Sequence, residues 1–294
     1  MMFDEQESGA RLSPLPRAVI RVPMALLVAL LTVVVVSGCS QAGGGAAGSF
    51  HSSTPKVLTV ATALVPTPGL WEGSATRPAG GFEFCIAEAL AARFGLPRIR
   101  VVVVPFQRLV GGDLGGADLA LSLITPTRQR DRVLDFSAPY LTVPPTVLAR
   151  SGVDVPDLKS ARALRWVTVR GTTLEQILDR RIQPTIPLVR VLSRPEVISA
   201  LQGGRADAAL FDFPLALAYA SRSAGRLHVP AKLDQPEQIA AALPQGSRNA
   251  QAVDSAIRAL IADGTIERLS QRWLGPGAKD SGTNLPILRS TRGE

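Results

Sequence analysis

The sequence predicts an α/β protein in which strands alternate with helices that cover both faces of a sheet. Three observations lead to this prediction. From Val57 onward, short runs of β-branched residues alternate with runs of Ala and Leu at helical spacing. The 294 residues are 46% hydrophobic with a mean hydropathy of +0.19, which is enough apolar surface to bury a core. At roughly 100–200 residues per domain, the length fits one large domain or two of medium size.

Individual strands and helices can be predicted in chain order. The strands are expected at 57–62, 99–104, 118–123, 146–149, 165–169, 188–192 and 207–211. The helices are expected at 84–94, 174–178, 194–203, 214–221 and 249–262, with a last one capped by Thr265. Ile86 and Leu90 share one face of the first helix, and Gly95 ends it. Ser193 and Glu196 have the spacing of a capping box at the start of the third.

The N-terminal segment is predicted to be an export signal. Three arginines precede the 15 uncharged residues 22–36. As a helix this run rises only about 22 Å, which is short of the roughly 30 Å hydrocarbon core of a bilayer. The ending Val36-Ser37-Gly38-Cys39 resembles the lipobox of bacterial lipoproteins, which implies that Cys39 is diacylated and becomes the mature N-terminus. The alternative is an ordinary membrane anchor in which this cysteine has no role.

The segment after the cysteine is predicted to be a flexible tether. Residues 40–55 carry no charged side chain and are rich in Gly and Ser. With a lipid on Cys39, such a tether would let a folded domain stand clear of the cell membrane, on its extracytoplasmic face. The other cysteine, Cys85, is expected to be a buried core residue and not a nucleophile.

Composition excludes several kinds of site. Two His and two Cys are too few for zinc fingers, an iron–sulfur cluster or a disulfide scaffold, so we expect no metal and no cofactor. The formal net charge is +8, from 32 Lys and Arg against 24 Asp and Glu. Because no window holds five cations together, no nucleic-acid partner is expected. Glycine motifs that bind phosphate are absent.

Side chains suited to a zwitterion come directly after several predicted strands. Ligands of open α/β sheets bind beyond the carboxyl ends of the strands. The residues found there are Trp71, Phe106, Thr125, Arg130, Thr172, Thr173 and Asp212. The carboxylate of an amino acid fits a guanidinium, and its ammonium fits a carboxylate. Thr173 and Gln176 have the spacing of a capping box, so free N–H groups from Gly171 onward are expected to face an anion. As ordinary structure, Arg130 would be a surface charge, and Thr173 and Asp212 would be helix caps.

Several segments together resemble a family of bacterial solute-binding proteins, family 3, which binds polar amino acids for ATP-driven importers. In chain order they are 81–83 (GFE), 118–130 (DLALSLITPTRQR), 133–140 (VLDFSAPY), 157–159 (DLK), 169–173 (VRGTT), 204–208 (GRADA), Asp212 and 262–265 (ADGT) with Trp273. The resemblance extends from about Val57 to Gly275 in the family's order.

This resemblance implies a two-lobed periplasmic-binding-protein-like fold of type II, in which each lobe is a mixed sheet flanked by helices. Two hinge strands would join the lobes. The implied boundaries are a signal peptide at 1–39, a tether at 40–55, lobe 1 at 56–146 and 242–276, lobe 2 at 147–241 and a C-terminal tail at 277–294. A ligand that touches both lobes would bind the closed form better and populate it. We expect a monomer.

The resemblance also implies roles for individual residues. The family's carboxylate-binding arginine falls on Arg130, six residues before Phe136, and not on Arg128. The other ligand-binding positions fall on Trp71, Phe106, Leu123 (through its backbone), Thr125, Gly171, Thr172, Thr173 and Asp212, the last for the ammonium. The family often has an Asp after the first strand, where this chain has Ala63. With the apolar Leu123, this departure favours a neutral or apolar amino acid over a cationic one.

We therefore expect a binding protein, not an enzyme, that delivers an amino acid to an ABC permease and its ATPase. One alternative is an enzyme on the same fold, since a few relatives in the family are periplasmic cyclohexadienyl dehydratases. General acid–base chemistry would then rest on Asp or Glu, because the chain has only His51 and His228. Another alternative is a lipoprotein that senses its ligand and feeds no importer.

Overall fold

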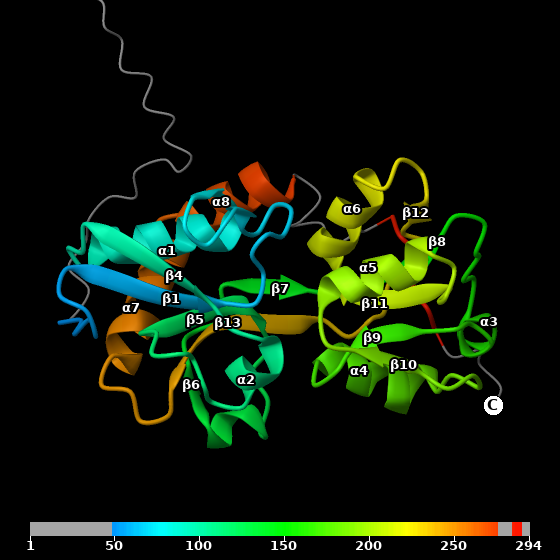
Figure 1. Cartoon of the computed structure of the whole chain (residues 1–294), viewed down its shortest axis with the longest axis horizontal. Coiled ribbons are helices and arrows are strands. Elements are labelled where there is room, and N and C mark those ends of the chain that lie inside the picture. The colour runs from blue at the N-terminus through cyan, green and yellow to red at the C-terminus, as the bar shows by residue number, and fades with distance from the viewer. Residues whose placement is uncertain (1–48, 276–283, 290–294) are drawn as a thin grey trace, which may run out of the picture. The chain divides into compact units, whose positions relative to one another are not determined.

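Two sheet regions, each packed against helices, make up the part of the chain that the computed structural model describes, residues 49–275 and 284–289 (Figure 1). The predicted signal peptide, Cys39 and the first part of the predicted tether lie outside these residues. The end of the tether belongs to the folded part. Phe50 stacks on Phe94 at 4.2 Å between ring centroids, and the backbone of His51 exchanges two hydrogen bonds of 2.9 Å with the Asn249 side chain. Because the Phe50 ring packs on Phe94, the end of the predicted tether is part of the folded structure.

The first sheet has six strands within the described residues, and it is mixed. They are β4 (Arg98–Val103), β1 (Val57–Thr62), β5 (Leu119–Ile124), β13 (Glu237–Pro244) and β6 (Leu134–Phe136), in that spatial order, with β7 (Leu141–Val143) also on β13. β1 is parallel to β4 and β5, whereas β13 is antiparallel to β5, β6 and β7. A short hairpin, β2 (Glu72–Gly73) and β3 (Pro78–Gly80), precedes the first helix.

Helices cover both faces of this sheet, so that the central strands β1 and β5 are buried on both sides. Along β5, Leu119 and Leu121 join one apolar cluster, and Ala120 and Ile124 join another. The first cluster is shared with α1 (Phe82–Arg93), α7 (Ala250–Ala262) and α8 (Thr265–Leu274), and the second with α2 (Phe106–Val110). In Figure 1, α1 and α2 lie on opposite faces of the sheet. Phe106, the first residue of α2, is thereby placed beyond the carboxyl end of β4.

The second region combines an antiparallel and a parallel group of strands. β8 (Pro145–Arg150) lies between β11 (Ala208–Asp212) and β12 (Leu227–His228), while β9 (Val167–Val169) pairs in parallel with β10 (Val189–Val191). A bridge between Trp166 and Ala208 joins the two groups. The helical elements are α3 (Leu158–Arg162), α4 (Thr173–Ile177), the π-helical turn η2 (Leu178–Ile182), α5 (Arg194–Gln202) and α6 (Phe213–Ser221).

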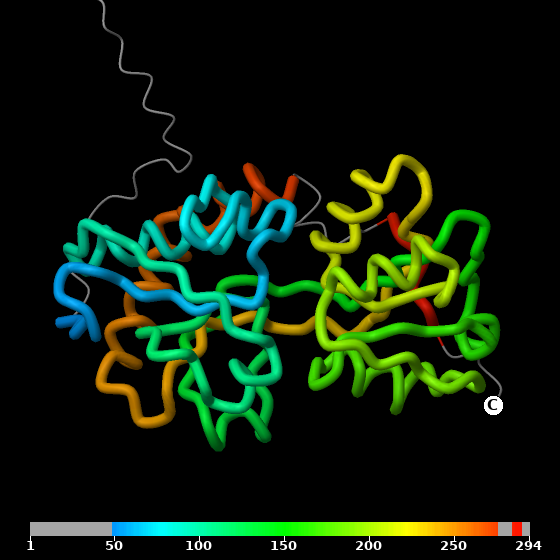
Figure 2. The backbone as a smooth tube through the Cα atoms, in the orientation of Figure 1, coloured from blue at the N-terminus to red at the C-terminus, as the bar shows by residue number. Residues whose placement is uncertain are grey.

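Two adjacent strands carry the chain between the regions. β7 leads into β8, and β13 returns the chain, pairing antiparallel with β7 so that Glu237 lies opposite Val143 (Figure 2). The C-terminal segment 284–289 then packs on the second region. Ile287 forms a bridge with Lys232, and Leu288 is fully buried in the apolar cluster of that region. The predicted tail therefore contributes to a core.

All seven predicted strands occur, with ends shifted by at most two residues. The prediction missed β13 and the short strands β2, β3, β6, β7 and β12. The alanine-rich sequence of β13, EQIAAALP, has low strand propensity and is buried only through its partners. Three caps differ from the prediction. Thr265 does not cap α8 but is its first residue, and Gly264 is the N-cap. Thr172, not Thr173, caps α4 and accepts a hydrogen bond from the Glu175 N–H. The Ser193 hydroxyl donates to the Glu196 carboxylate at 2.6 Å, so the expected capping box is not formed.

Candidate functional site

Arg130 connects the two sheet regions. It begins a 3-10 turn (Arg130–Arg132) after β5, and only 6% of its surface is exposed. Its guanidinium donates to the carbonyl of Thr125 at 2.6 Å and to the carbonyl of Gly171, in the other region, at 3.1 Å. Burial lowers its pKa to about 10, and the nearby carboxylate of Glu237 opposes this shift. The structure thus brings together Arg130, Thr125 and Gly171, as the sequence predicted.

Two guanidinium groups lie near the ring of Phe106. The Cζ atom of Arg130 is 5.4 Å from the centroid of its ring, and that of Arg194 is 5.7 Å away. Next to it on α2, the Gln107 side chain donates to the carbonyls of Arg170 at 3.0 Å and Leu192 at 3.3 Å, again across the two regions. Arg194 was not predicted. It is the first residue of α5, directly after β10, so the rule that ligands bind beyond strand ends could have found it.

Asp212 is a buried carboxyl group at the end of β11. Only 6% of its surface is exposed, and it is the N-cap residue of α6 without making a side-chain cap. Burial raises its pKa to about 6, although the positive charge of Arg194 lowers it. Among the described residues no other residue donates a hydrogen bond to its carboxylate. An acceptor in this state is suited to a cationic group.

Glu237 is a second buried carboxyl group, and nothing local in the sequence predicted it. It begins β13, one of the two crossing strands, and 8% of its surface is exposed. Burial and the charge of Asp212 raise its pKa to about 7, against the opposing effects of the Thr173 and Thr125 hydroxyls and of Arg130. Glu237 thus lies close to the predicted arginine and threonines, and the charge of Asp212 reaches Glu237.

The loop at 171–173 offers fewer free donors than the sequence predicted. The N–H of Gly171 donates to a carboxylate oxygen of Glu175 at 2.6 Å. The Thr172 hydroxyl caps α4 and donates to the carbonyl of Val169 at 2.8 Å. Because the cap lies one residue earlier than predicted, both groups are engaged within the loop. Thr173 remains half-buried and lines a cavity.

Two other residues predicted to contact the ligand make hydrogen bonds within the core instead. The N–H of Leu123, which was expected to face a ligand, donates to Glu83 at 2.8 Å, since a φ of 48° turns this peptide inward. Trp71 is fully buried, packs edge-on against Phe84 and donates from its indole nitrogen to Glu83 at 2.9 Å. The Glu83 carboxylate also accepts from the hydroxyl of Tyr140, and burial raises its pKa. Glu83 is thus a buried acceptor that anchors three donors in the core.

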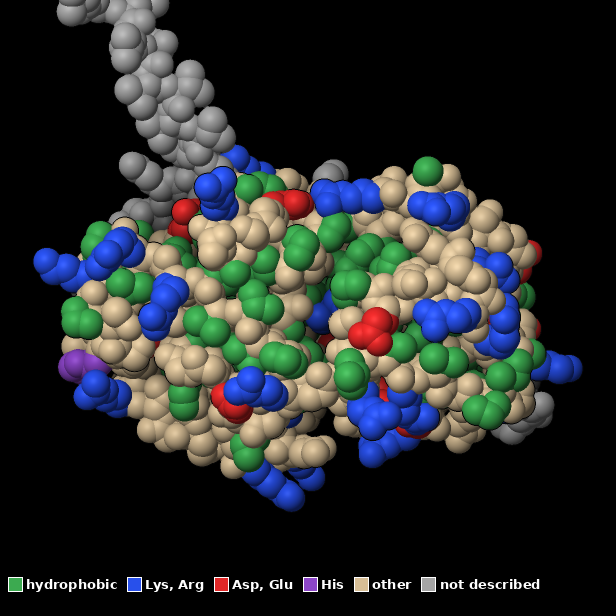
Figure 3. Space-filling model, viewed as in Figure 1, with side chains coloured by type: hydrophobic (Ala, Val, Ile, Leu, Met, Phe, Trp, Pro, Cys, Tyr) green, Lys and Arg blue, Asp and Glu red, His purple; other side chains and the backbone are tan. Residues whose placement is uncertain are grey.

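Two neighbouring cavities border some of these groups, although Phe106, Asp212 and Arg194 line neither of them. One of about 260 Å³ is lined by Thr125, Thr173 and Glu237, and one of about 370 Å³ by Arg130, Gly171 and Gln107. Both also touch Thr127 and Gln176. The face seen in Figure 3 is hollowed between the two regions, with acidic and basic side chains at the hollow. These spaces have the size of a small polar molecule.

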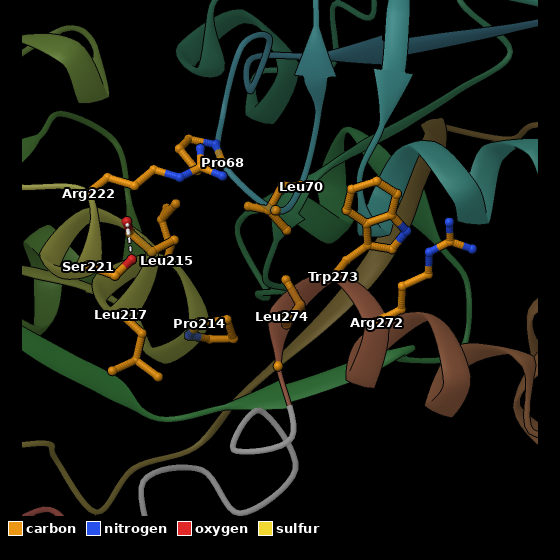
Figure 4. Close-up of a pocket in the computed structure, with 13 residues that line it drawn as sticks. Pro68, Leu70, Pro214, Leu215, Leu217, Ser221, Arg222, Arg272, Trp273 and Leu274 are labelled. Carbon is orange, nitrogen blue, oxygen red and sulfur yellow. Dashed lines mark hydrogen bonds between the residues drawn. The ribbon is translucent and has the colours of Figure 1, made fainter. Parts of the chain in front are cut away.

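A third cavity, of about 420 Å³, has a different character. In Figure 4 the apolar side chains of α6, such as Leu215, face Leu70 and the end of α8 at Leu274. Two arginines reach it, but none of its lining residues is a carboxylate. It therefore lacks a carboxylate to pair with an ammonium group, and the polar cavities are the better candidates.

Other kinds of site are not supported by the described residues. Within 49–275 and 284–289, no three His, Cys, Asp or Glu residues are grouped so as to hold a metal ion. In the same ranges, no helix combines the length and the apolar character that crossing a bilayer requires.

Two α/β lobes, joined by paired crossing strands and with polar groups of both lobes between them, define a binding protein of the type II periplasmic class. The chain belongs to the bacterial extracellular solute-binding proteins, family 3, whose family profile matches residues 66–276.

Known proteins support this assignment. The L-cystine-binding protein TcyJ of Escherichia coli K12 is 26% identical over 261 residues, covering 85% of this chain and 94% of that protein. The amino-acid-binding protein AabA of Dichelobacter nodosus is 28% identical, covering 66% and 78%. A crystal structure of the ancestral amino acid-binding protein AncCDT-1, described as a precursor of cyclohexadienyl dehydratase, superposes with a TM-score of 0.65 at 23% identity, covering 74% and 95%. This last likeness concerns the fold.

Proposed function

We propose that this protein binds an amino acid between its two lobes and delivers it to an ABC permease and its ATPase. The observation that carries the proposal is that each lobe contributes a buried group of opposite charge. Arg130 comes from lobe 1 and already reaches the Gly171 carbonyl of lobe 2, and Asp212 of lobe 2 is a buried acceptor without a donor from another described residue. Names of relatives that bind cystine or amino acids support the same class of ligand.

In the proposed complex, Arg130 pairs with the α-carboxylate and Asp212 with the α-ammonium. Thr125 and Thr173, which line one cavity from the two lobes, add hydroxyl groups, and Phe106 packs on the ligand side chain. The carboxylate would replace the carbonyl groups that Arg130 contacts now, because a charge-assisted, bidentate pair is stronger than a neutral hydrogen bond. A ligand held by both lobes favours the closed form.

The remaining expectations from the sequence form part of this proposal. Lobe 1 would comprise 56–146 and 242–276, and lobe 2 147–241, with the hinge in β7–β8 and β12–β13. Acylated Cys39 would hold a monomer at the extracytoplasmic face of the cell membrane. Radiolabelled palmitate supplied to cells that make the chain tests the anchor, since a Cys39→Ala variant would then take up no label.

Isothermal titration calorimetry of the purified full chain against the twenty amino acids tests the proposed function. We expect saturable heat from at least one of them, and its loss in the Asp212→Asn variant. Heat from no amino acid would contradict the proposal.

A second candidate is a cyclohexadienyl dehydratase-like enzyme. It is favoured by the likeness to AncCDT-1 and by Glu237, whose pKa of about 7 suits a general acid. Incubation with prephenate or arogenate, then chromatography, separates the two functions, because only the enzyme forms the aromatic product.

A further inference from the structure

Arg194 brings a second positive charge to the proposed ligand site. It opens α5 on lobe 2, and its guanidinium stands 5.7 Å from the centroid of Phe106, a lobe 1 residue. Arg130 approaches the same ring from lobe 1 at 5.4 Å. If Arg130 takes the α-carboxylate, Arg194 is left beside the ring on which the ligand side chain packs.

Arg194 lacks an anionic partner within the described part of the chain. No hydrogen bond or salt bridge of its side chain occurs there, although Arg165 pairs with Asp207 and Arg190 pairs with Glu175. The residue is half-buried, and burial lowers its pKa against the opposing charges of Asp212 and Glu83. Those two carboxyl groups have other partners. Asp212 binds the ammonium group in the proposed complex, and Glu83 accepts hydrogen bonds from three donors in the core. A partly desolvated guanidinium without a partner is costly, and an anion that fits against it recovers that cost.

The surrounding charges favour an anion over a cation. Ala63 directly follows β1, so lobe 1 offers no carboxylate at that strand end. Glu237 lies on the side of Thr125 and Thr173, where both hydroxyls interact with it. Among the described residues of the proposed site, the positive charge without a partner is therefore that of Arg194, beside Phe106. Among the same residues, the negative charge without a partner is that of Asp212.

We propose that Arg194 binds an anionic group on the side chain of the ligand, so that the protein selects amino acids with an acidic side chain. This inference rests on the proposed function, and it replaces the sequence-based expectation of a neutral or apolar ligand. Arg194 is then the residue that determines specificity, since the amide analogue of an acidic ligand would leave its charge unpaired.

Calorimetry with matched pairs of ligands tests the inference on the full chain. We expect L-glutamate or L-aspartate to bind roughly 10- to 100-fold more tightly than L-glutamine or L-asparagine, the range of a charge-assisted hydrogen bond. The Arg194→Gln variant should lose this preference while it keeps its affinity for the amide. Arg205→Gln, which changes an exposed arginine of the same lobe, should keep the preference.

The possible outcomes distinguish this inference from the proposed function. If the amides or L-arginine bind as tightly as the acidic ligands, the inference is wrong while the proposed function stands. If no amino acid binds, both are wrong. Circular dichroism of the ligand-free Arg194→Gln chain checks its folding, and the comparison of acid with amide on the unchanged protein decides the matter even if that variant does not fold.

Discussion

Truncation of Arg130 is expected to abolish amino-acid binding. The side chain is almost fully buried, lies over Phe106 and spans from the Thr125 carbonyl of one lobe to the Gly171 carbonyl of the other. In the Arg130→Ala variant, a bound carboxylate would be enclosed without its counter-charge. Removal of one partner of a buried ion pair costs about 3–5 kcal/mol, which corresponds to a roughly 100- to 4,000-fold loss of affinity.

Arg128 provides the matched control for this prediction. It lies two residues earlier in the same turn, but its side chain is exposed. Titration calorimetry with the tightest amino acid should give nearly unchanged binding for Arg128→Ala and no measurable heat for Arg130→Ala. The reverse result would refute both the assigned register and the role of the Thr125–Gly171 contacts.

Three further predictions concern pH and stability. Burial raises the pKa of Asp212 to about 6 and of Glu237 to about 7. The folded protein therefore holds more protons than the unfolded chain between roughly pH 4 and 7. Its free energy of unfolding should fall as the pH rises through that range. Urea unfolding at pH 5 and 7.5 measures this slope, which should flatten in Glu237→Gln. Because a bound ammonium favours the ionised carboxylates, ligand binding should release protons near pH 6–7; equal heats in buffers of different ionisation enthalpy would contradict this. Leu288→Ala should lower stability by about 2–5 kcal/mol, because its side chain is fully buried, whereas Arg289→Ala at an exposed position should have little effect in the same unfolding assay.

The local sequence predicted much of this fold. Strands such as Val57–Thr62 and helices such as α7 have a hydrophobic period that depends only on neighbouring residues, and they were found within one or two positions. The register of the motif that ends at Phe136 also assigned Arg130 and Thr125 to one site, and in the structure the Arg130 guanidinium donates to the Thr125 carbonyl. In both cases the information lies within a few residues of chain.

The tertiary structure decided which of the candidate groups are free to meet a ligand. Leu123 and Trp71 looked available in the sequence, but both donate to Glu83, which is brought to them from another element. Glu237 was missed because its environment is made by residues far away in the chain, Asp212 and two threonines. The place of Arg194 after β10 could have been inferred from the sequence, but its contact with Phe106 could not. A local pattern determines where a strand ends and which side chains come directly after it. The charge balance of a cleft depends instead on long-range crossings such as β7–β13, because these bring its two walls together.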